Sequence, residues 1–211
     1  MSLTSTISQR EIVVFDFDGT ITTKDTFALF LRYYAGTIQW VCNILKLLPI
    51  FIAYGLRIID RNTVKIHVIR KFFKNASVTD LDERAQRFAR EVIPGLIRPL
   101  AQLELDRKKQ HAESLYICSA SITPYLQVWG RDQNIGNILA TELEQNGSRY
   151  TGEIKGWNVW GEGKIRRIHS EFAPEIVHIK EAYGDSRGDR ELLHAADVSH
   201  WRPFRVDVLN V

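Results

Sequence analysis

Residues 12–20 read IVVFDFDGT, and this stretch decides the fold of the chain. Four apolar residues, the pattern of a strand buried on both faces, lead directly into Asp16 and Asp18. Side chains alternate along a strand, so the two carboxylates point to the same side, where open α/β sheets bind their ligands. Two such carboxylates repel each other unless a cation or a shared proton intervenes, which indicates a metal-assisted site. A pair of turn-forming aspartates that simply end the strand is the structural alternative.

Strand-like segments alternate with helical segments along most of the chain. After the first strand, we expect strands at residues 114–119, 137–143, 176–183 and 196–201, with helices at 100–112, 122–133 and 163–172 between them. This alternation predicts an α/β fold, in which a doubly wound parallel sheet forms a Rossmannoid core with right-handed crossovers.

Residues 25–91 break this rhythm, because they contain no convincing strand. They read as helices at residues 26–34, 38–47, 50–59, 63–74 and 79–91, and Pro49 is expected to separate the second helix from the third. We therefore predict an α/β core domain formed by residues 10–24 and 92–211, and a helical cap domain formed by the inserted residues 25–91.

Composition and charge exclude several classes of protein. The 211 residues are 45% hydrophobic and 25% charged, as in ordinary globular proteins, and their formal net charge is +3. The small net charge and the lack of a recognition motif indicate that nucleic acid is not a partner. Cys42 and Cys118 lie in apolar runs, so both are expected to be buried thiols in a reducing compartment. No apolar signal-peptide core precedes the first strand, so a cytoplasmic location is expected.

The apolar segment at residues 38–59 has three possible interpretations. It is rich in large apolar side chains but is interrupted by Gln39, Asn43, Lys46 and Pro49. A membrane-spanning helix needs about 20 mostly apolar residues, and the uncharged stretch at residues 47–56 is about half as long. Helices packed within the cap are favoured, peripheral contact with the inner membrane surface is the second interpretation, and a membrane span is the third.

Three further elements end a predicted strand or begin a predicted helix. Ser119 closes the strand at residues 114–119, and Lys164 begins a helix after the sequence GEG. The sequence GDSRGD at residues 184–189, which contains Asp185 and Asp189, directly follows the strand at residues 176–183. Taken singly, each has an ordinary explanation: a strand-ending serine, a solvated lysine, or an aspartate that caps a helix.

Together with IVVFDFDGT, these elements resemble the four motifs of the haloacid dehalogenase-like hydrolase superfamily, in the same order and from Ile12 to about Trp201. The position of the cap, after the first motif, resembles the phosphoserine-phosphatase-like branch. The sequences CSAS at residues 118–121 and YTGEI at residues 150–154 look like a bacterial subgroup of that branch that includes lipid-phosphate phosphatases. The apolar run in the cap is similar to phosphatidylglycerophosphate phosphatases of the same subgroup.

The resemblance implies an Mg²⁺-dependent phosphatase that hydrolyses a phosphate monoester through an aspartyl-phosphate. Asp16 would be the nucleophile, and Asp18 the general acid and then the general base. Dehalogenation does not need the acid and base that Asp18 supplies, so phosphate transfer is preferred over it. Mg²⁺ favours hard oxygen ligands, here the Asp16 carboxylate, the main-chain carbonyl of Asp18 and the Asp185 carboxylate.

The remaining motif residues would support this chemistry. Lys164 would add a fixed positive charge beside the nucleophile, and Ser119 would donate a hydrogen bond to a phosphate oxygen. Gly19 permits a tight backbone turn, with Thr20 beside it. Asp189 would support the metal site, directly or through a water molecule.

Four polar residues of the cap are candidates for substrate binding. Asp25 matches the position where phosphoserine phosphatases carry a glutamate, and its shorter side chain puts phosphoserine in doubt; it could equally be a helix N-cap. Arg57, Arg61 and Lys65 are spaced by four residues, so they are expected on one helix face. That face is either solvated or meets a phosphate-bearing substrate or an acidic membrane surface.

The predicted partner is a small or amphiphilic phosphate ester. The resemblance leaves three expectations open for the enzyme: a phosphoserine phosphatase, a lipid-phosphate phosphatase at the membrane surface, or a phosphatase of another metabolite. A phosphoacceptor signalling domain and a membrane-surface binding protein are the alternatives that are not enzymes. The first needs neither the acid Asp18 nor a large cap, and the intact set of motifs argues against the second.

Overall fold

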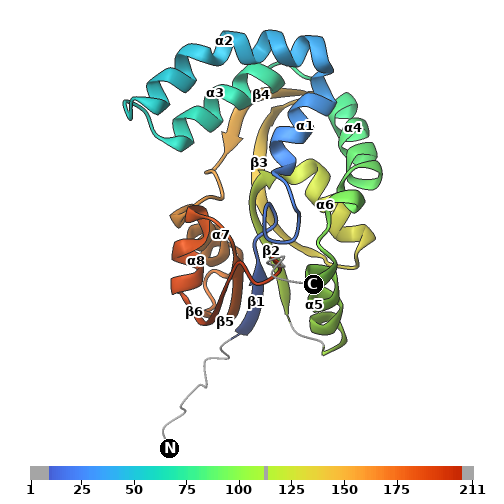
Figure 1. The fold of residues 1–211 in the computed structure, drawn as a ribbon, viewed down its shortest axis with the longest axis vertical. Helices are drawn as coiled ribbons and strands as arrows, with labels where there is room; N and C mark the ends of the chain where they lie inside the picture. The colour runs from blue at the N-terminus through green and yellow to red at the C-terminus, as the bar shows by residue number, and fades with distance from the viewer. Residues whose placement is uncertain (1–9, 112–113, 206–211) are drawn as a thin grey trace, which may run out of the picture.

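The computed structural model describes residues 10–111 and 114–205, and its strands form one sheet in the order β4-β3-β2-β1-β5-β6 (Figure 1). All neighbouring strands are parallel except β3 and β4, which are antiparallel, so the expected α/β core is confirmed. Residues 112–113 and 206–211 of the expected core lie outside the described part. The strands are β1 (Arg10–Phe15), β2 (Leu115–Ile122), β3 (Asn137–Asn146), β4 (Arg149–Lys155), β5 (Val177–Gly184) and β6 (Ala196–Trp201).

Helices cover both faces of the sheet, because β1 is apolar on both sides. Val13 and Phe15 pack into a hydrophobic cluster with α5 (Pro99–Gln110), α6 (Thr123–Asp132) and the cap. Ile12 and Val14 point the other way, into a second cluster with α7 (Glu162–Phe172) and α8 (Arg190–His194). Figure 1 shows these two helical layers on opposite sides of the strands. Short 3₁₀ turns, η1 (Ile93–Leu96) and η2 (Arg187–Asp189), complete the described core.

The strand order positions the functional site. From β1 the chain leads to β2 and β3 on one side, whereas β5 and β6 lie on the other side of β1. The carboxyl end of β1 is therefore a topological switch point, where connections diverge and leave a crevice. The sequence places Asp16 and Asp18 immediately after that end.

The cap consists of four helices inserted between β1 and β2: α1 (Thr26–Ala35), α2 (Thr37–Gly55), α3 (Arg61–Phe73) and α4 (Val78–Glu91). Its centre is aromatic: the Phe30 ring contacts the rings of Phe73 and Phe88. Phe30 and Phe88 also contact Tyr125 of α6, so cap and core share one continuous hydrophobic cluster. This shared cluster fixes the cap above the carboxyl ends of the strands.

Helix α2 corrects two expectations. The two helices expected at residues 38–47 and 50–59 are wrong: α2 runs without a break through Pro49 and ends at Gly55. A proline inside a helix removes one hydrogen bond, here the bond to the carbonyl of Leu45. Pro49 and Leu45 both lie on the exposed side, where water can solvate that carbonyl. Cys42 lies on the exposed side too, so only Cys118 of the two expected buried thiols is buried.

Strand β4 was not expected from the sequence. It forms an antiparallel hairpin with β3 and reaches the cap, where Gly152 lies close to Lys74 at the end of α3. The signal that could have revealed it is Gly147-Ser148, a two-residue connection in which Gly147 has a φ of 58°. The expected parallel sheet therefore carries one additional antiparallel strand at its edge.

Candidate active site

A cavity of about 300 Å³ lies at the carboxyl end of β1, between the cap and the core. Its walls come from segments far apart in the sequence: the loop after β1, helix α3, the end of β2, the loop before α7 and the loop after β5. The polar and aromatic residues that line it are Asp16, Asp18, Thr23, Lys24, Asp25, Phe27, Arg61, Lys65, Ser121, Asn158, Trp160, Lys164, Asp185, Ser186 and Asp189.

Asp16 is at the centre of this cavity and is only 5% exposed. One carboxylate oxygen, Oδ1, accepts a hydrogen bond of 2.6 Å from Lys164 Nζ, and the other accepts one of 2.9 Å from Thr20 Oγ1. The Lys164 ammonium also donates to Asp189 Oδ1 at 2.6 Å. Lys164 therefore bridges the two carboxylates, as its place at the start of α7 allows.

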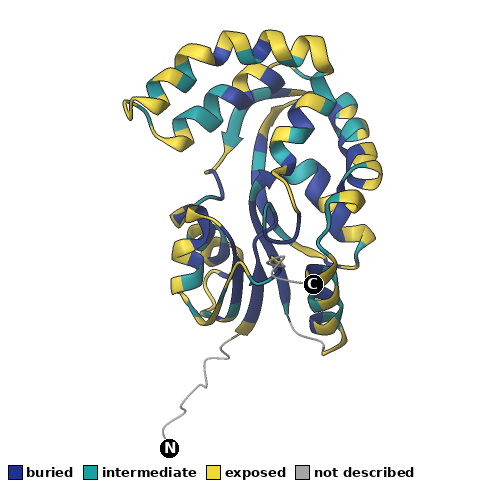
Figure 2. Cartoon of the chain, in the orientation of Figure 1, coloured by how far each residue is buried: buried dark blue, intermediate teal, exposed yellow. Residues whose placement is uncertain are grey.

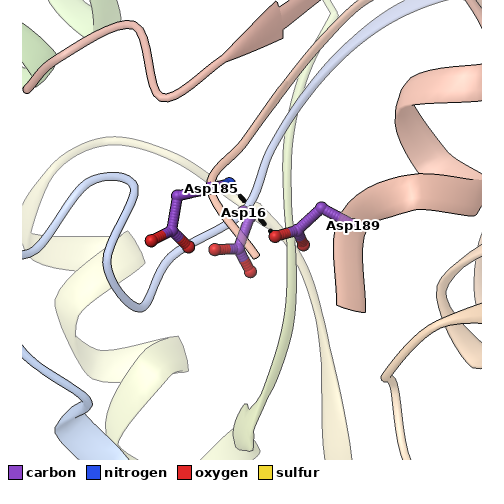
Figure 3. Close-up of side chains that lie close together, drawn as sticks. All are labelled: Asp16, Asp185 and Asp189. Carbon is purple, nitrogen blue, oxygen red and sulfur yellow. Dashed lines mark hydrogen bonds between the residues drawn. The ribbon is translucent and has the colours of Figure 1, made fainter. Parts of the chain in front are cut away.

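Three carboxylates converge at this point. Figure 3 shows Asp185 and Asp189 on opposite sides of Asp16, with their carboxylates turned toward it. One ligand oxygen from each of the three lies within 4.8 Å of the others. Asp189 is held in place because its Oδ2 accepts hydrogen bonds from the backbone N–H groups of Asp185 and Ser186. Asp189 also occupies the N-cap position of α8, but its side chain makes no capping hydrogen bond there.

Asp185 provides an incomplete set of contacts, which indicates a site for a cation. Its Oδ2 accepts a hydrogen bond of 2.5 Å from Arg205, whereas its Oδ1 is buried and, within the described residues, has no hydrogen-bond partner. Gly19 has a φ of 81°, and a Cβ there would lie 2.5 Å from Asp185 Oδ2. A buried, unpaired carboxylate oxygen beside two more carboxylates fits a hard divalent cation.

Burial governs the protonation of the charged groups. It raises the pKa of Asp16 to about 8, although the charge of Lys164 acts in the opposite direction. Burial opposes the charged form of Lys164, but Asp16 and Asp189 outweigh it and raise the lysine pKa above its ordinary value. Lys164 therefore stays an ammonium, and a second positive charge would favour the carboxylate form of Asp16.

Asp18 is held by the cap and by β2. Its Oδ1 accepts hydrogen bonds of 2.6 Å from both the backbone N–H and the hydroxyl of Thr26, the first residue of α1. Its Oδ2 accepts from the Ser121 hydroxyl at 2.5 Å. Burial and the nearby charge of Asp25 raise the pKa of Asp18, while the hydrogen bonds of Ser121 and Thr26 lower it in part. The net direction favours a protonated carboxyl, which can donate a proton into the cavity.

Two serines at the end of β2 lie beside Asp18. Ser119 is fully buried; its hydroxyl accepts from the Ser121 backbone N–H at 3.0 Å and lies 3.4 Å from Asp18 Oδ2. Ser121 lines the cavity, and Ser119 lies behind it. The expectation that Ser119 donates a hydrogen bond to a phosphate oxygen stays a prediction, and in this structure Ser119 orders the segment that presents Ser121.

The basic residues of the cap divide into two groups. Arg61 and Lys65, one turn apart on α3, both line the cavity, and the Lys65 ammonium donates to the carbonyl of Ala120 at 2.8 Å. Arg57 belongs to the exposed turn after α2, with a φ of 60°, and not to α3. The expected face shared by all three is wrong, because the helix begins only at Arg61. Burial, offset by the charges of Asp25 and Asp18, lowers the pKa of Lys65 to about 8.

Asp25 fits both expectations for its location, at the N-cap of a helix and in the wall of the cavity. It caps α1, because its side chain accepts a hydrogen bond of 2.9 Å from the backbone N–H of Ala28, and it also lines the cavity. Two cross-cavity contacts were not foreseen from the sequence: Asn158 Nδ2 donates to Asn62 of the cap at 2.8 Å, and the Arg61 guanidinium lies 5.5 Å from the centre of the Trp160 ring. Thr26 and Arg205 were also missed, because isolated polar residues carry no motif, and Ser121 was missed although it belongs to the sequence CSAS.

Known proteins share the sequence or the fold of most of this chain. The chain is 35% identical over 200 residues to the protein CicA of Caulobacter vibrioides, covering 92% of this chain and 86% of CicA. Its fold is similar to a Bordetella pertussis Tohama I protein of unknown function (TM-score 0.76, 20% identity, 89% of this chain and 87% of that one). It is also similar to a probable phosphoserine phosphatase from Vibrio cholerae (TM-score 0.64, 15% identity), with 92% of this chain matching 56% of that longer chain.

A family model covers most of the described core and the whole cap. It matches residues 13–194, from the first strand to the end of α8 and including all of the site carboxylates described above. The chain belongs to the haloacid dehalogenase-like hydrolases.

Proposed function

We propose that this protein is an Mg²⁺-dependent phosphatase that hydrolyses a phosphate monoester through an aspartyl-phosphate on Asp16. The observation that carries the proposal is the buried Asp16 carboxylate at the switch point, bound to Lys164 and adjacent to Asp185, whose Oδ1 has no partner in the described structure. The fold shared with a probable phosphoserine phosphatase supports the same reaction class.

The cation would be held by the carboxylates of Asp16 and Asp185 and by the main-chain carbonyl of Asp18, with Asp189 in support. When bound, it neutralises negative charge on the phosphoryl oxygens. The ion pair with Lys164 gives Asp16 a fixed orientation and keeps a positive charge beside the nucleophile. Positioning and electrostatic stabilisation provide most of the catalysis in phosphoryl transfer.

In the first half of the reaction, a carboxylate oxygen of Asp16 attacks phosphorus, and the bond from phosphorus to the ester oxygen breaks. Asp18 donates its proton to that leaving oxygen, which departs as an alcohol. The raised pKa of Asp18 keeps the proton available for this step.

In the second half, Asp18, now a carboxylate, takes a proton from a water molecule. The water oxygen bonds to phosphorus and the bond to Asp16 breaks, which releases inorganic phosphate and restores both aspartates. Thr26 and Ser121 hold Asp18 in one orientation for both steps. The cap contacts from Lys65 to Ala120 and from Asn62 to Asn158 limit the access of bulk water.

Arg61 and Lys65 suggest what the substrate carries beyond the phosphate. Both cations line the cavity on the cap side, and Asp25 is the acidic group there. This arrangement favours an ester whose leaving group has its own negative charge, and an arriving anion would favour the ammonium form of Lys65. Phosphoserine, through its carboxylate, and a phosphatidylglycerophosphate-type lipid, through its phosphodiester, both meet that description.

The test is Mg²⁺-dependent phosphate release from a panel of phosphoserine, sugar phosphates, nucleotides and lipid phosphates in detergent. We expect turnover by the natural chain, none by Asp16→Asn, and a rise in KM without a comparable fall in kcat for Arg61→Gln on the preferred ester. Mg²⁺ should also raise the melting temperature of the natural chain but not that of Asp185→Asn, since a ligand stabilises the state that binds it.

Two results would contradict the proposal. Turnover that survives in Asp16→Asn would show that another group is the nucleophile. A folded protein that binds Mg²⁺ but releases no phosphate from any ester of the panel would instead favour a phosphoacceptor or binding role for the same site.

A further inference from the structure

Helix α2 exposes a continuous apolar ridge on the outside of the cap. Figure 2 shows this helix, at the top of the molecule, as mostly exposed. We define the α2 ridge as Ile38, Val41, Leu45, Leu48, Ile52 and Leu56. Their spacing of three or four residues puts them on one side of the helix. Ile38, Leu45 and Leu56 are 83%, 61% and 67% exposed, so the ridge is an interaction surface and not part of the core.

The opposite side of α2 already has its partner. Asn43 and Leu47 are buried, and Trp40, Ile44, Ile50 and Phe51 pack against the hydrophobic core of the cap. Among the described residues, α2 is the one helix long and apolar enough to cross a membrane. To cross it, however, α2 would have to leave the cap and abandon these contacts. The apolar composition of α2 therefore serves two surfaces, one inside the cap and one outside.

The charged residues in the sequence that carries the α2 ridge, residues 26–59, are all positive. No aspartate or glutamate occurs between Asp25 and Asp60, whereas Arg32, Lys46 and Arg57 all lie in that stretch and are exposed. Lys46 is on α2 itself, Arg32 lies over the Trp40 ring at 5.8 Å, and Arg57 follows the end of the ridge. Cations beside an apolar helix face are typical of helices that lie at the surface of a membrane with anionic lipids.

One more aliphatic side chain lies exposed just beyond the α2 ridge. Ile58, in the turn that leads to α3, is 71% exposed. The end of α2 thus combines exposed aliphatic residues with Arg57.

We propose that the α2 ridge binds the surface of a lipid bilayer that contains anionic headgroups, with α2 lying in the plane of the interface. A second copy of the chain fits this surface less well. A symmetric contact along the α2 ridge would set Arg32, Lys46 and Arg57 against the same cations, and the stretch offers no acidic residue to pair with them. Anionic headgroups supply the missing charge. The proposal concerns the cap alone and does not depend on phosphatase activity.

Vesicle flotation of the full chain tests the proposal. The probes are vesicles of phosphatidylcholine alone and vesicles of phosphatidylcholine with phosphatidylglycerol. We expect the natural chain to float with the anionic vesicles. The triple variant Leu45→Gln, Leu48→Gln, Ile52→Gln should lower the partition coefficient on the order of a hundredfold, because it removes three aliphatic contacts. Lys46→Gln with Arg57→Gln should lower it roughly tenfold on anionic vesicles.

The matched control is Leu103→Gln, Ile176→Gln, Val198→Gln, three exposed aliphatic residues outside the cap. It should float as the natural chain does. Circular dichroism melting checks that every variant is folded. A folded variant that no longer floats has therefore lost the membrane-binding surface and not its fold. Failure of the natural chain to float, or flotation of the α2 triple variant at the natural level, would refute the proposal. The natural chain could instead form a dimer in solution and bind no vesicles. If the α2 triple variant is then a monomer, the α2 ridge is the contact with a second copy.

Discussion

Lys164 and Lys108 are two buried lysines, each about 1% exposed, in two regions of the same core. Lys164 lies in the cavity and contacts Asp16 and Asp189. Lys108, on α5, forms an ion pair of 2.5 Å with Glu181 of β5. A buried lysine–carboxylate pair is therefore not sufficient to mark an active site.

The difference lies in what surrounds each pair. The second oxygen of Glu181 accepts a hydrogen bond of 2.8 Å from Tyr183 and lies 3.2 Å from a ring nitrogen of His200, so both of its oxygens have partners. Beside Lys164, Asp185 Oδ1 has no partner in the described structure, and the group opens into a cavity. An unmatched buried acceptor that a ligand can reach distinguishes the functional pair from the structural one.

The largest predicted effect is a difference in catalytic activity between variants of the two lysines. We expect Lys164→Met to lower kcat about 10³-fold, because it removes a fixed charge from the site of phosphoryl transfer. Lys108→Met should leave kcat close to that of the natural chain but lower the free energy of unfolding by about 3 kcal/mol, because it leaves Glu181 without its cation. Steady-state kinetics and denaturant unfolding of both variants measure this. A comparable loss of kcat in the two variants would remove the distinction.

A glycine substitution tests the space around the site carboxylates. Gly19 and Gly156 both have a φ of 81°, but a Cβ at Gly19 would meet Asp185 Oδ2 at 2.5 Å, whereas a Cβ at Gly156 would meet nothing within 4 Å. Both alanine variants carry the same backbone strain, about 1 kcal/mol. Because Gly19→Ala also displaces Asp185, we expect it to lower kcat/KM about 100-fold. Gly156→Ala is the control, and equal kinetics for the two variants would show that the close approach has no role in function.

The smallest effect is a pH dependence of stability that belongs to the structural pair. Burial opposes the ionisation of Glu181, but the hydrogen bonds of Lys108 and Tyr183 and the lysine charge outweigh it and lower its pKa to about 2. Because the folded pKa is below the ordinary value of 4.5, this stabilisation is complete above about pH 4.5 and is lost as the pH falls toward 2.

Denaturant unfolding over that pH range checks this prediction, with Glu181→Gln as the reference. The reference variant should show a smaller loss of stability on acidification than the natural chain. Parallel curves for the two proteins would show that Glu181 is not stabilised by the Lys108 pair.

The sequence predicted much of the core of the site. Asp16 and Asp18 follow a strand whose four apolar residues must be buried on both faces, so their position at the end of a central strand followed from the pattern alone. Lys164 and Asp185 were expected nearby because the motifs that contain them resemble, in type and order, those of the haloacid dehalogenase-like hydrolases. The structure brings all four to one cavity.

The choice between Ser119 and Ser121 could not be made in this way. The pairing of β2 with β3 shifts register between Ser119 and Ile122, so the regular alternation of side chains fails at this point. Regular alternation would put both serines on one side of the strand; the irregularity re-aims the side chains around it, and it depends on the pairing with the neighbouring strand. Arg205 was missed for a similar reason, because its contact with Asp185 spans different elements.

The sequence by itself determined the fold class, the order of the motifs and the identity of the carboxylates, since strand periodicity and burial are local properties of a segment. Only the tertiary structure decided which side of α2 meets the cap and which is exposed. Large apolar residues occur on both sides of that helix, so its periodicity cannot distinguish the two sides. The choice is made by the cap core around Phe30 and Phe73, which takes Leu47 and leaves Leu45 and Leu48 outside.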